Sequence, residues 1–407
     1  MTILAAIAFV LAQGEPSLES RVATYSAQLA DESTRDRARD RLVHFGRPGL
    51  ALLEKSVIDS ASIASIRQEV AFNETLGAAY GPPHLFNFDG NEESLGVLLS
   101  RLEIAASMPF QKNSLDLSQK LTLKMEDASF WEALDEICKK ASIWYYPATE
   151  PLYLNGGVAS QKPRVYYGPL MIVLDRVIHQ RRITFSAIES DFTIRLLLVW
   201  EKSVAPLGAT GRYRLAQATE DSGASLIPAA ARQQPAGRSA MLVRNPGQGV
   251  DLAGLLMPSA KAKSLARVEG TLELEFPARI DEVRFELPAE GFSTPREKSI
   301  EGAKVELKSF GPPAAWGATL EASIRFDDPR EAAEFRIGMS DVEFIVPGDV
   351  KRSGWIGTAK LEKDVYSFSA HWRNGGRAEM PKEVRFRIPR GGVIKNVPFC
   401  FKDVDLK

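Results

Sequence analysis

Histidines, carboxylates and serines, the residue types that bind metals or move protons, are scattered in this chain. The four histidines are His44, His84, His179 and His371. They fall in separate predicted elements and lack the spacing of zinc ligands. Asp327 and Asp328 are adjacent at a strand end, where neighbouring side chains usually point apart, so they form a poor calcium site. The serines form neither a GxSxG elbow nor an SxxK motif. We therefore predict no catalytic residue, no metal site, no cofactor and no enzyme activity.

Aromatic side chains are the other residues that could bind a ligand. A flat indole can stack on a sugar ring, and four tryptophans fall in the β-rich half of the chain. They are Trp200, Trp316, Trp355 and Trp372. Tryptophans are more often core residues. A sugar-stacking platform on these strands is therefore the alternative interpretation.

One predicted helix contains four residues whose side chains could take part in binding or catalysis. They are Trp131, Glu132, Asp135 and Cys138. Ser129 and Glu132 have the spacing of a capping box, so the helix should begin at Phe130. The Glu132 carboxylate should then accept a hydrogen bond from the Ser129 amide, which gives this residue a structural role. The apolar stripe includes Cys138, and the solvent face includes Asp135. Trp131 lies beside the stripe, and we predict it as a possible contact for a partner.

That helix belongs to the stretch LTLKMEDASFWEALDEICKKASIWYY, residues 121–146. Alternating apolar residues predict a strand before the helix, and another strand follows it. The wider segment 85–154 should read strand, helix, strand, strand, helix, strand, strand, with Asn91 as the cap of the first helix. These are two similar half-units in tandem, which predicts a small α+β domain at 83–157.

The first helix segment, NEESLGVLLSRLEIAA, and the EAL core at Glu132 to Leu134 resemble the secretin and TonB short N-terminal domain. The resemblance covers residues 85–154. It implies a periplasmic interaction module that has no catalytic residues. No amphipathic β-barrel segments follow in the sequence, so the resemblance does not extend to pore formation.

The segment at 17–80 is predicted to be helical, with Gly46 ending one helix and Pro48 opening the next. Its paired helices resemble a HEAT-type repeat. Such arrays need about three repeats to bury a continuous core, so we predict a helical cap rather than a solenoid. An arginine run in this segment consists of Arg35, Arg37, Arg39 and Arg41. The interleaved aspartates predict a solvated helix face rather than a basic patch.

From residue 162 onward, strand patterns alternate with turns. We predict a β-rich domain at 162–262 and a β-sandwich domain at 264–407, as one or two antiparallel sandwiches. Phe192 to Trp200, FTIRLLLVW, is almost continuously apolar and should be the most buried strand. EVRFELP at Glu282 to Pro288 recurs as EVRFRIP at Glu383 to Pro389. Either a duplicated sandwich or convergence would produce this echo.

The start of the chain predicts export. Ile3 to Ala12 is an apolar run about as long as a signal-peptide core and too short to span a bilayer. Small residues at its end predict a signal peptide at 1–12 with cleavage after Ala12. The missing basic residues before it leave a misassigned start, or the end of a buried helix, as alternatives. No later stretch is long and apolar enough for a transmembrane segment in the mature chain.

The composition is that of an ordinary globular protein, with 44% hydrophobic residues, 25% charged residues and a net charge of -1. A charge near zero argues against a nucleic-acid partner. Cys138 and Cys400 are too few for a disulfide framework. The apolar position of Cys138 favours a packed thiol, and a bridge to Cys400 is the alternative.

These features predict a multidomain α+β and all-β protein: a helical cap, a secretin-N-like α+β domain, then sandwich material. We expect an exported, non-enzymatic interaction or structural scaffold, periplasmic or associated with the cell envelope, that binds an envelope protein. A carbohydrate-binding or adhesive β-sandwich protein is the alternative. A hydrolase is a more distant one.

Overall fold

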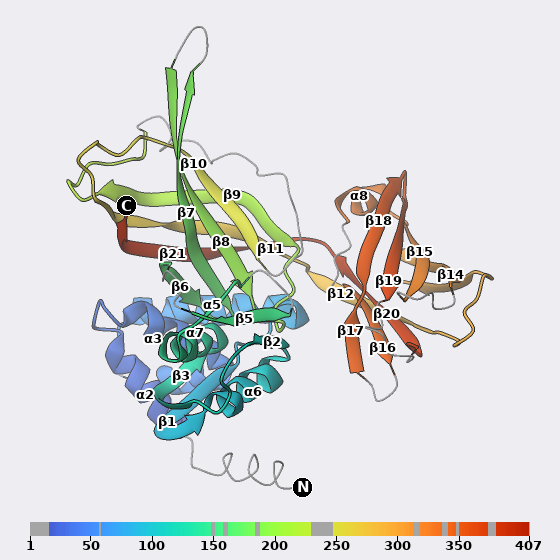
Figure 1. Ribbon diagram of the computed structural model, residues 1–407, viewed down its shortest axis with the longest axis horizontal. Helices are drawn as coiled ribbons and strands as arrows, with labels where there is room; N and C mark the ends of the chain where they lie inside the picture. The colour runs from blue at the N-terminus through green and yellow to red at the C-terminus, as the bar shows by residue number, and fades with distance from the viewer. Residues whose placement is uncertain are drawn as a thin grey trace. The chain divides into compact units, whose positions relative to one another are not determined.

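The predicted mixture of a few helices with several antiparallel sheets is confirmed: the structure is about 24% helix and 51% strand (Figure 1). The computed structural model describes residues 16–56, 58–147, 151–157, 162–183, 188–228, 247–311, 317–335, 341–346, 350–372 and 380–406. The predicted signal peptide at 1–12 lies outside these ranges. Within them, no helix has the length and apolar character needed to cross a bilayer. The chain divides into two compact units, Met1–Thr75 and Leu76–Lys407.

The first unit is helical, as predicted. Its helices are α2 (Leu18–Gln28), α3 (Arg35–His44), α4 (Gly46–Leu53) and α5 (Ser60–Leu76). They enclose a core of Val22, Tyr25, Ala38, Leu42, Val43, Leu53, Ile66 and Val70. The α2 helix begins at a side-chain cap, because the Ser17 hydroxyl accepts from the Ser20 amide.

The arginine run of α3 does not form one solvated face. Arg41 is buried and donates to the Asp40 carboxylate at 2.6 Å. Residues two apart on a helix point in nearly opposite directions, so four alternate positions cannot all face water. The prediction of a solvated face is therefore wrong for Arg41.

The second unit opens with the predicted order of elements. They are β1 (Leu85–Ser94), α6 (Leu95–Ala106), β2 (Phe110–Asn113), β3 (Lys120–Ser129), α7 (Phe130–Ala141), β4 (Ile143–Tyr145) and β5 (Leu152–Gly156). Strand β1 pairs antiparallel with β3. In a second sheet, β5 lies between β2 and β4, parallel to the first and antiparallel to the second. We call residues 85–156 the α+β module.

The start of α6 differs from the prediction. Asn91 lies in β1 rather than at a helix cap, because β1 stays paired with β3 as far as Ser94. Two amides at the start of α6 instead donate to backbone carbonyls of the loop before β3. They are the amides of Leu95 and Gly96, which donate to Gln119 and Leu117 at 2.8 and 2.9 Å. Backbone carbonyls thus accept hydrogen bonds from the first amides of α6, in place of a capping side chain.

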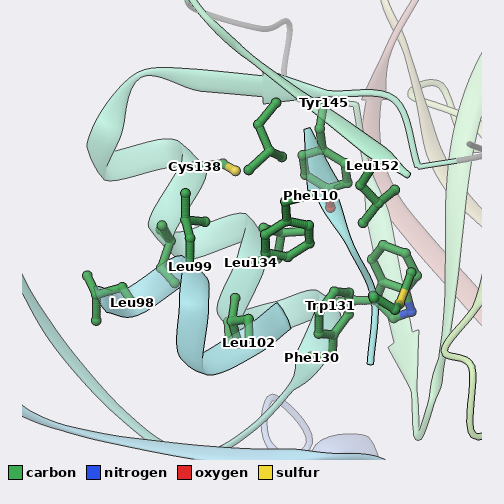
Figure 2. Close-up of a cluster of buried hydrophobic side chains, with 14 of the residues drawn as sticks. Leu98, Leu99, Leu102, Phe110, Phe130, Trp131, Leu134, Cys138, Tyr145 and Leu152 are labelled. Carbon is green, nitrogen blue, oxygen red and sulfur yellow. The ribbon is translucent and has the colours of Figure 1, made fainter. Parts of the chain in front are cut away.

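The start of α7 is as predicted. The Ser129 hydroxyl accepts from the Glu132 amide, and the Glu132 carboxylate accepts from the Ser129 amide at 2.7 Å. Figure 2 shows side chains of α6 and α7 pointing into one core together with Phe110, Tyr145 and Leu152. Cys138 lies in that core as a thiol, and burial raises its pKa to about 12. Cys400 is also a thiol, so the alternative of a bridge is wrong.

Long strands follow the α+β module. They are β6 (Arg164–Tyr167), β7 (Leu170–Ile183), β8 (Ile188–Trp200), β9 (Gly208–Glu220), β10 (Gln248–Leu255), β11 (Ser264–Phe276) and β21 (Val393–Asp405). One sheet has the order β10-β8-β7-β6 and the other β21-β11-β9. The last strand pairs with β11 along its whole length, and Figure 1 shows the two side by side. The predicted boundary between 262 and 264 is therefore wrong, because β9 before it pairs with β11 after it.

Residues 279–390 are inserted between β11 and β21. Their elements are β12 (Arg279–Glu286), β13 (Arg296–Ile300), β14 (Ala303–Phe310), β15 (Ala318–Phe326), α8 (Pro329–Glu334), β16 (Val342–Val346), β17 (Val350–Ser353), β18 (Trp355–Glu362), β19 (Val365–Trp372) and β20 (Glu383–Arg390). The sheet orders are β12-β20-β16-β17 and β13-β14-β15-β19-β18. Apolar residues from both sheets form one buried cluster.

The two echoing segments are neighbours in this insertion, because β12 pairs antiparallel with β20. Each valine of the repeated VRF lies opposite a phenylalanine of the other strand: Val283 faces Phe386, and Phe285 faces Val384. All four side chains are buried. A duplicated sandwich would place the segments in two separate sheets. The two similar segments are therefore neighbouring strands of one sheet with the same alternation of residues. Convergence would produce this arrangement.

We expect Ser129→Ala to lower the free energy of unfolding by about 1 kcal/mol, because the change removes the acceptor for the Glu132 amide at the start of α7. Chemical denaturation of the full chain would measure the loss. Ser100→Ala, in the middle of α6, is the matched control and should change stability by less than about 0.5 kcal/mol. Equal effects of the two substitutions would show that the cap does not stabilise the helix.

Candidate functional site

Trp131, the predicted partner contact, is 0% exposed. Its ring lies edge-on to Phe130 and stacks with Tyr145, at centroid distances of 4.9 and 6.5 Å. Its Nε1 donates to the Pro169 carbonyl oxygen at 3.3 Å. The prediction therefore needs correction, because the surface that Trp131 meets belongs to the same chain. A side chain at the edge of a helical stripe becomes core when a second layer covers that edge.

The covering layer is the sheet that contains β7 and β8. Side chains from both strands enter the core of the α+β module: Met171, Val173, Leu197 and Val199. Residues on the opposite face of β8, such as Leu196 and Leu198, are also buried. Burial of both faces explains the almost continuous apolar run of Phe192 to Trp200, which was predicted to be the most buried strand.

Asp135 lies in a polar cluster at the same junction rather than on a solvent face. The Tyr145 and Tyr166 hydroxyls each donate to its carboxylate at 2.5 Å, and Arg164 forms an ion pair with it. Burial raises the pKa of Tyr166 to about 12 and that of Tyr145 well above its ordinary value, so both remain donors near neutral pH. Burial also lowers the pKa of Arg164. The cluster joins β4 and β6 to α7 through hydrogen bonds and an ion pair. Its role is therefore structural.

A second polar contact joins the segment before β1 to the end of β8. His84 Nδ1 lies 2.8 Å from Glu201 Oε2, and the same oxygen accepts from the His84 amide at 3.1 Å. The Glu201 side chain is fully buried and that of His84 is about one-third exposed. The hydrogen bond to Glu201 raises the pKa of His84. Backbone hydrogen bonds from Gly81 to Ser203 and from Ala205 to Ala79 reinforce the contact.

Lys395 of β21 contributes to the same region. Its Nζ lies 4.8 Å from the ring centroid of Tyr80 and 5.4 Å from that of Tyr167, and the side chain is buried. Tyr80 also meets Phe276 edge-on at 5.4 Å. A buried ammonium group over two aromatic faces is a stabilising cation–π arrangement. It ties the last strand to the segments at both ends of the α+β module.

The other residues with a possible chemistry lie apart from this junction. His44 lies 3.5 Å from Asp40, His179 packs on Phe192, and His371 lies 3.1 Å from the Thr319 hydroxyl. The Asp328 carboxylate accepts from the Arg330 amide and caps α8. In the part of the chain that the structure describes, no three His, Cys, Asp or Glu side chains are grouped to hold a metal ion.

The structure describes the side chains of two of the four tryptophans proposed as a sugar platform. Trp200 and Trp372 are buried, so they are core residues and not parts of a surface platform. Trp316 and the side chain of Trp355 lie outside the described residues. The proposed location of the platform is therefore wrong for the two tryptophans whose side chains are described.

A different set of aromatic side chains is exposed, on the outer face of the β2–β5–β4 sheet. Trp144, Tyr146 and Tyr153 are 42%, 48% and 42% exposed. Trp144 lies opposite Asn155, and Tyr153 lies opposite Gln111. We call the outward side chains of this sheet, together with Tyr146 directly after β4, the aromatic face; they are Gln111, Asn113, Trp144, Tyr146, Tyr153 and Asn155.

Sequence reasoning missed the aromatic face although a signal for it was present. The segment IWYY alternates buried Ile143 and Tyr145 with exposed Trp144 and Tyr146. Period-two alternation predicts that arrangement once the strand is recognised. The contribution of Tyr153 needed the pairing of β4 with β5, which decides which residues share a face.

No family model, curated protein or solved structure matches this chain. Two features stand out in the described structure: an internal junction that joins the α+β module to the long strands, and an aromatic face on the outside of the module.

We expect Trp131→Ala to lower the free energy of unfolding by about 3–5 kcal/mol, because it empties the junction between α7 and the β7–β8 layer. Trp131→Phe keeps a ring but removes the donor to Pro169, so its cost should be smaller, about 1–2 kcal/mol. Denaturation of the full chain would measure both. The control is Trp144→Ala, which removes an exposed indole. A Trp131→Ala effect no larger than the control would contradict the buried contact.

The His84–Glu201 contact should make stability depend on pH. Because the folded-state pKa of His84 is raised above its unfolded value, the contribution is fully present below about pH 6.5 and is lost as pH rises through the folded-state pKa. The stability difference between wild type and His84→Gln should therefore be largest near pH 5.5–6 and should shrink at higher pH. Denaturation of both proteins across this range measures it. In a Glu201→Gln background the trend should disappear, and a trend that persists there would rule out Glu201 as its cause.

Proposed function

We propose that this chain is an exported, non-enzymatic protein that serves as an interaction or structural scaffold in the cell envelope. The observation that carries the proposal is the aromatic face. Trp and Tyr side chains with more than two-fifths of their surface exposed are unusual on a well-packed sheet. These residue types provide much of the energy at binding surfaces.

The apolar stripe of α7 in the same module is not free for a partner. Trp131 and the α7 stripe are enclosed by β7 and β8, so association through that helix would require separation of a packed core. Polar contacts of Asp135 and His84 reinforce the attachment. The aromatic face is therefore presented on a rigid support, which lowers the entropy cost of binding.

The resemblance to the secretin and TonB short N-terminal domain supports the envelope setting. The order of elements in residues 85–156 and the EAL core at Glu132 to Leu134 agree with that interpretation. Modules of this kind act by association, and an envelope protein is the partner that the resemblance implies. The predicted signal peptide at 1–12 supports delivery to the same compartment.

We interpret the insertion at 279–390 as a single β-sandwich. The support is that its two sheets contribute to one buried cluster. In this interpretation the sandwich replaces the domain predicted at 264–407, and β11 and β21 belong instead to the sheet that they form with β9. The sandwich is a second structural part of the scaffold.

A carbohydrate-binding protein is the second candidate function. Its support is specific: the outward residues of the β2–β5–β4 sheet combine three aromatic rings with the amide side chains of Gln111, Asn113 and Asn155. Rings that stack and amides that hydrogen-bond are the groups that a sugar ligand requires. The candidate surface thus moves from the β-sandwich to the α+β module.

Fractionation of the cells that make the protein would test the proposed function. We expect the chain in the envelope fraction with a new N-terminus after Ala12, and we expect Trp144→Ala with Tyr153→Ala to release it from that fraction. The control is Ile104→Ala, because Ile104 is 69% exposed on α6 of the same module. An uncleaved chain outside the envelope, or envelope association that survives loss of both aromatic residues, would overturn the proposal.

A further inference from the structure

We infer that the aromatic face binds a neutral oligosaccharide, an inference that rests on the proposed function and names the chemistry of its ligand. Residues two apart on one strand are spaced by about 7 Å, and neighbouring strands lie about 5 Å apart. Trp144 lies on β4, Tyr153 lies on the adjacent strand β5, and Tyr146 is the residue directly after β4. Trp144 and Tyr153 therefore share one surface of the sheet, and the exposed ring of Tyr146 follows Trp144 in the chain.

The charge of the face decides against an ionic ligand. Its six side chains are aromatic rings or amides, and none is charged at neutral pH. The lysine of β2, Lys112, alternates to the other side, where it pairs with Glu103 at 2.8 Å. The six described side chains of this face offer no cation to a polyanion and no carboxylate to a basic peptide. The complementary ligand is polar but uncharged.

The size of the aromatic face matches an oligosaccharide. At their exposed fractions, three aromatic side chains offer roughly 200 to 330 Å². A stable protein interface buries about 800 Å² on each partner. The three rings would be only one part of such an interface, and by themselves they match a ligand of a few sugar rings.

The chemistry of a pyranose fits these groups. One face of the ring presents C–H groups, which stack on an aromatic ring, and the ring edge presents hydroxyls, which exchange hydrogen bonds with amides. Gln111 lies directly opposite Tyr153, and Asn155 lies opposite Trp144. Each of these rings therefore has an amide beside it. Asn113 Nδ2 donates to Asn155 Oδ1 at 3.2 Å, which orients this pair of amides.

The support beneath the face is rigid. The inward residues of β4 and β5, Tyr145, Leu152 and Leu154, are buried in the core of the α+β module. Tyr145 is also fixed by its hydrogen bond to Asp135 and its stacking on Trp131. A preformed surface of this kind binds without a large ordering cost.

Calorimetric titration of the full chain with neutral hexasaccharides tests the inference. The probes are cellohexaose, chitohexaose and maltohexaose, with an oligogalacturonate of equal length as the charged comparator. We expect at least one neutral probe to bind about tenfold more tightly than the charged one. Trp144→Ala should weaken that binding by about tenfold or more, Trp144→Phe should weaken it less, and the control Ile104→Ala should leave it within about twofold.

Two results would overturn the inference: no binding of any neutral hexasaccharide, or binding that Trp144→Ala and Tyr153→Ala leave within twofold. Denaturation midpoints of the variants would show that they remain folded. If the aromatic variants lose envelope association while no hexasaccharide binds, the occupant is not a neutral glycan but the proposed function stands. If the variants change neither association nor oligosaccharide binding, both proposals are wrong.

Discussion

The packing of α7 against β7 and β8 is the contact on which the larger unit depends. An α+β module of about seventy residues is near the lower limit for a stable core of its own. Trp131 at the centre of the contact, with Met171, Val173, Leu197 and Val199 from the strands, extends that core into the next layer. In return, the module covers one face of β8, which would otherwise expose a row of large apolar residues.

Polar contacts around this core fix its geometry. Asp135 is held by Tyr145, Tyr166 and Arg164, and the Glu201 carboxylate is held by the side chain and amide of His84. Charges that are buried, as on Glu201, or mostly buried, as on Asp135, are tolerated only when they are paired and hydrogen-bonded. These contacts contribute less to the free energy of folding than to the choice of a single packing arrangement. A shifted module would leave the charged groups unpaired.

The same contact explains where binding can occur. A helix with an apolar stripe and a tryptophan at its edge has the pattern of an interaction surface, and in this chain the partner of that surface is an internal sheet. The opposite side of the module is a short three-stranded sheet whose outward residues are rings and amides. Function is therefore sought on the sheet rather than on the helix, and the proposed oligosaccharide site follows from that division.

The sequence by itself determined the features that depend on neighbouring residues. The capping box at Ser129 and Glu132, the order of elements in the α+β module, and the buried character of Phe192 to Trp200 all follow from local spacing, because caps and periodicity act within a few residues. Only the tertiary structure decided which surfaces meet. The burial of Trp131 and the pairing of β21 with β11 around an insertion depend on contacts between distant segments, which local patterns do not encode.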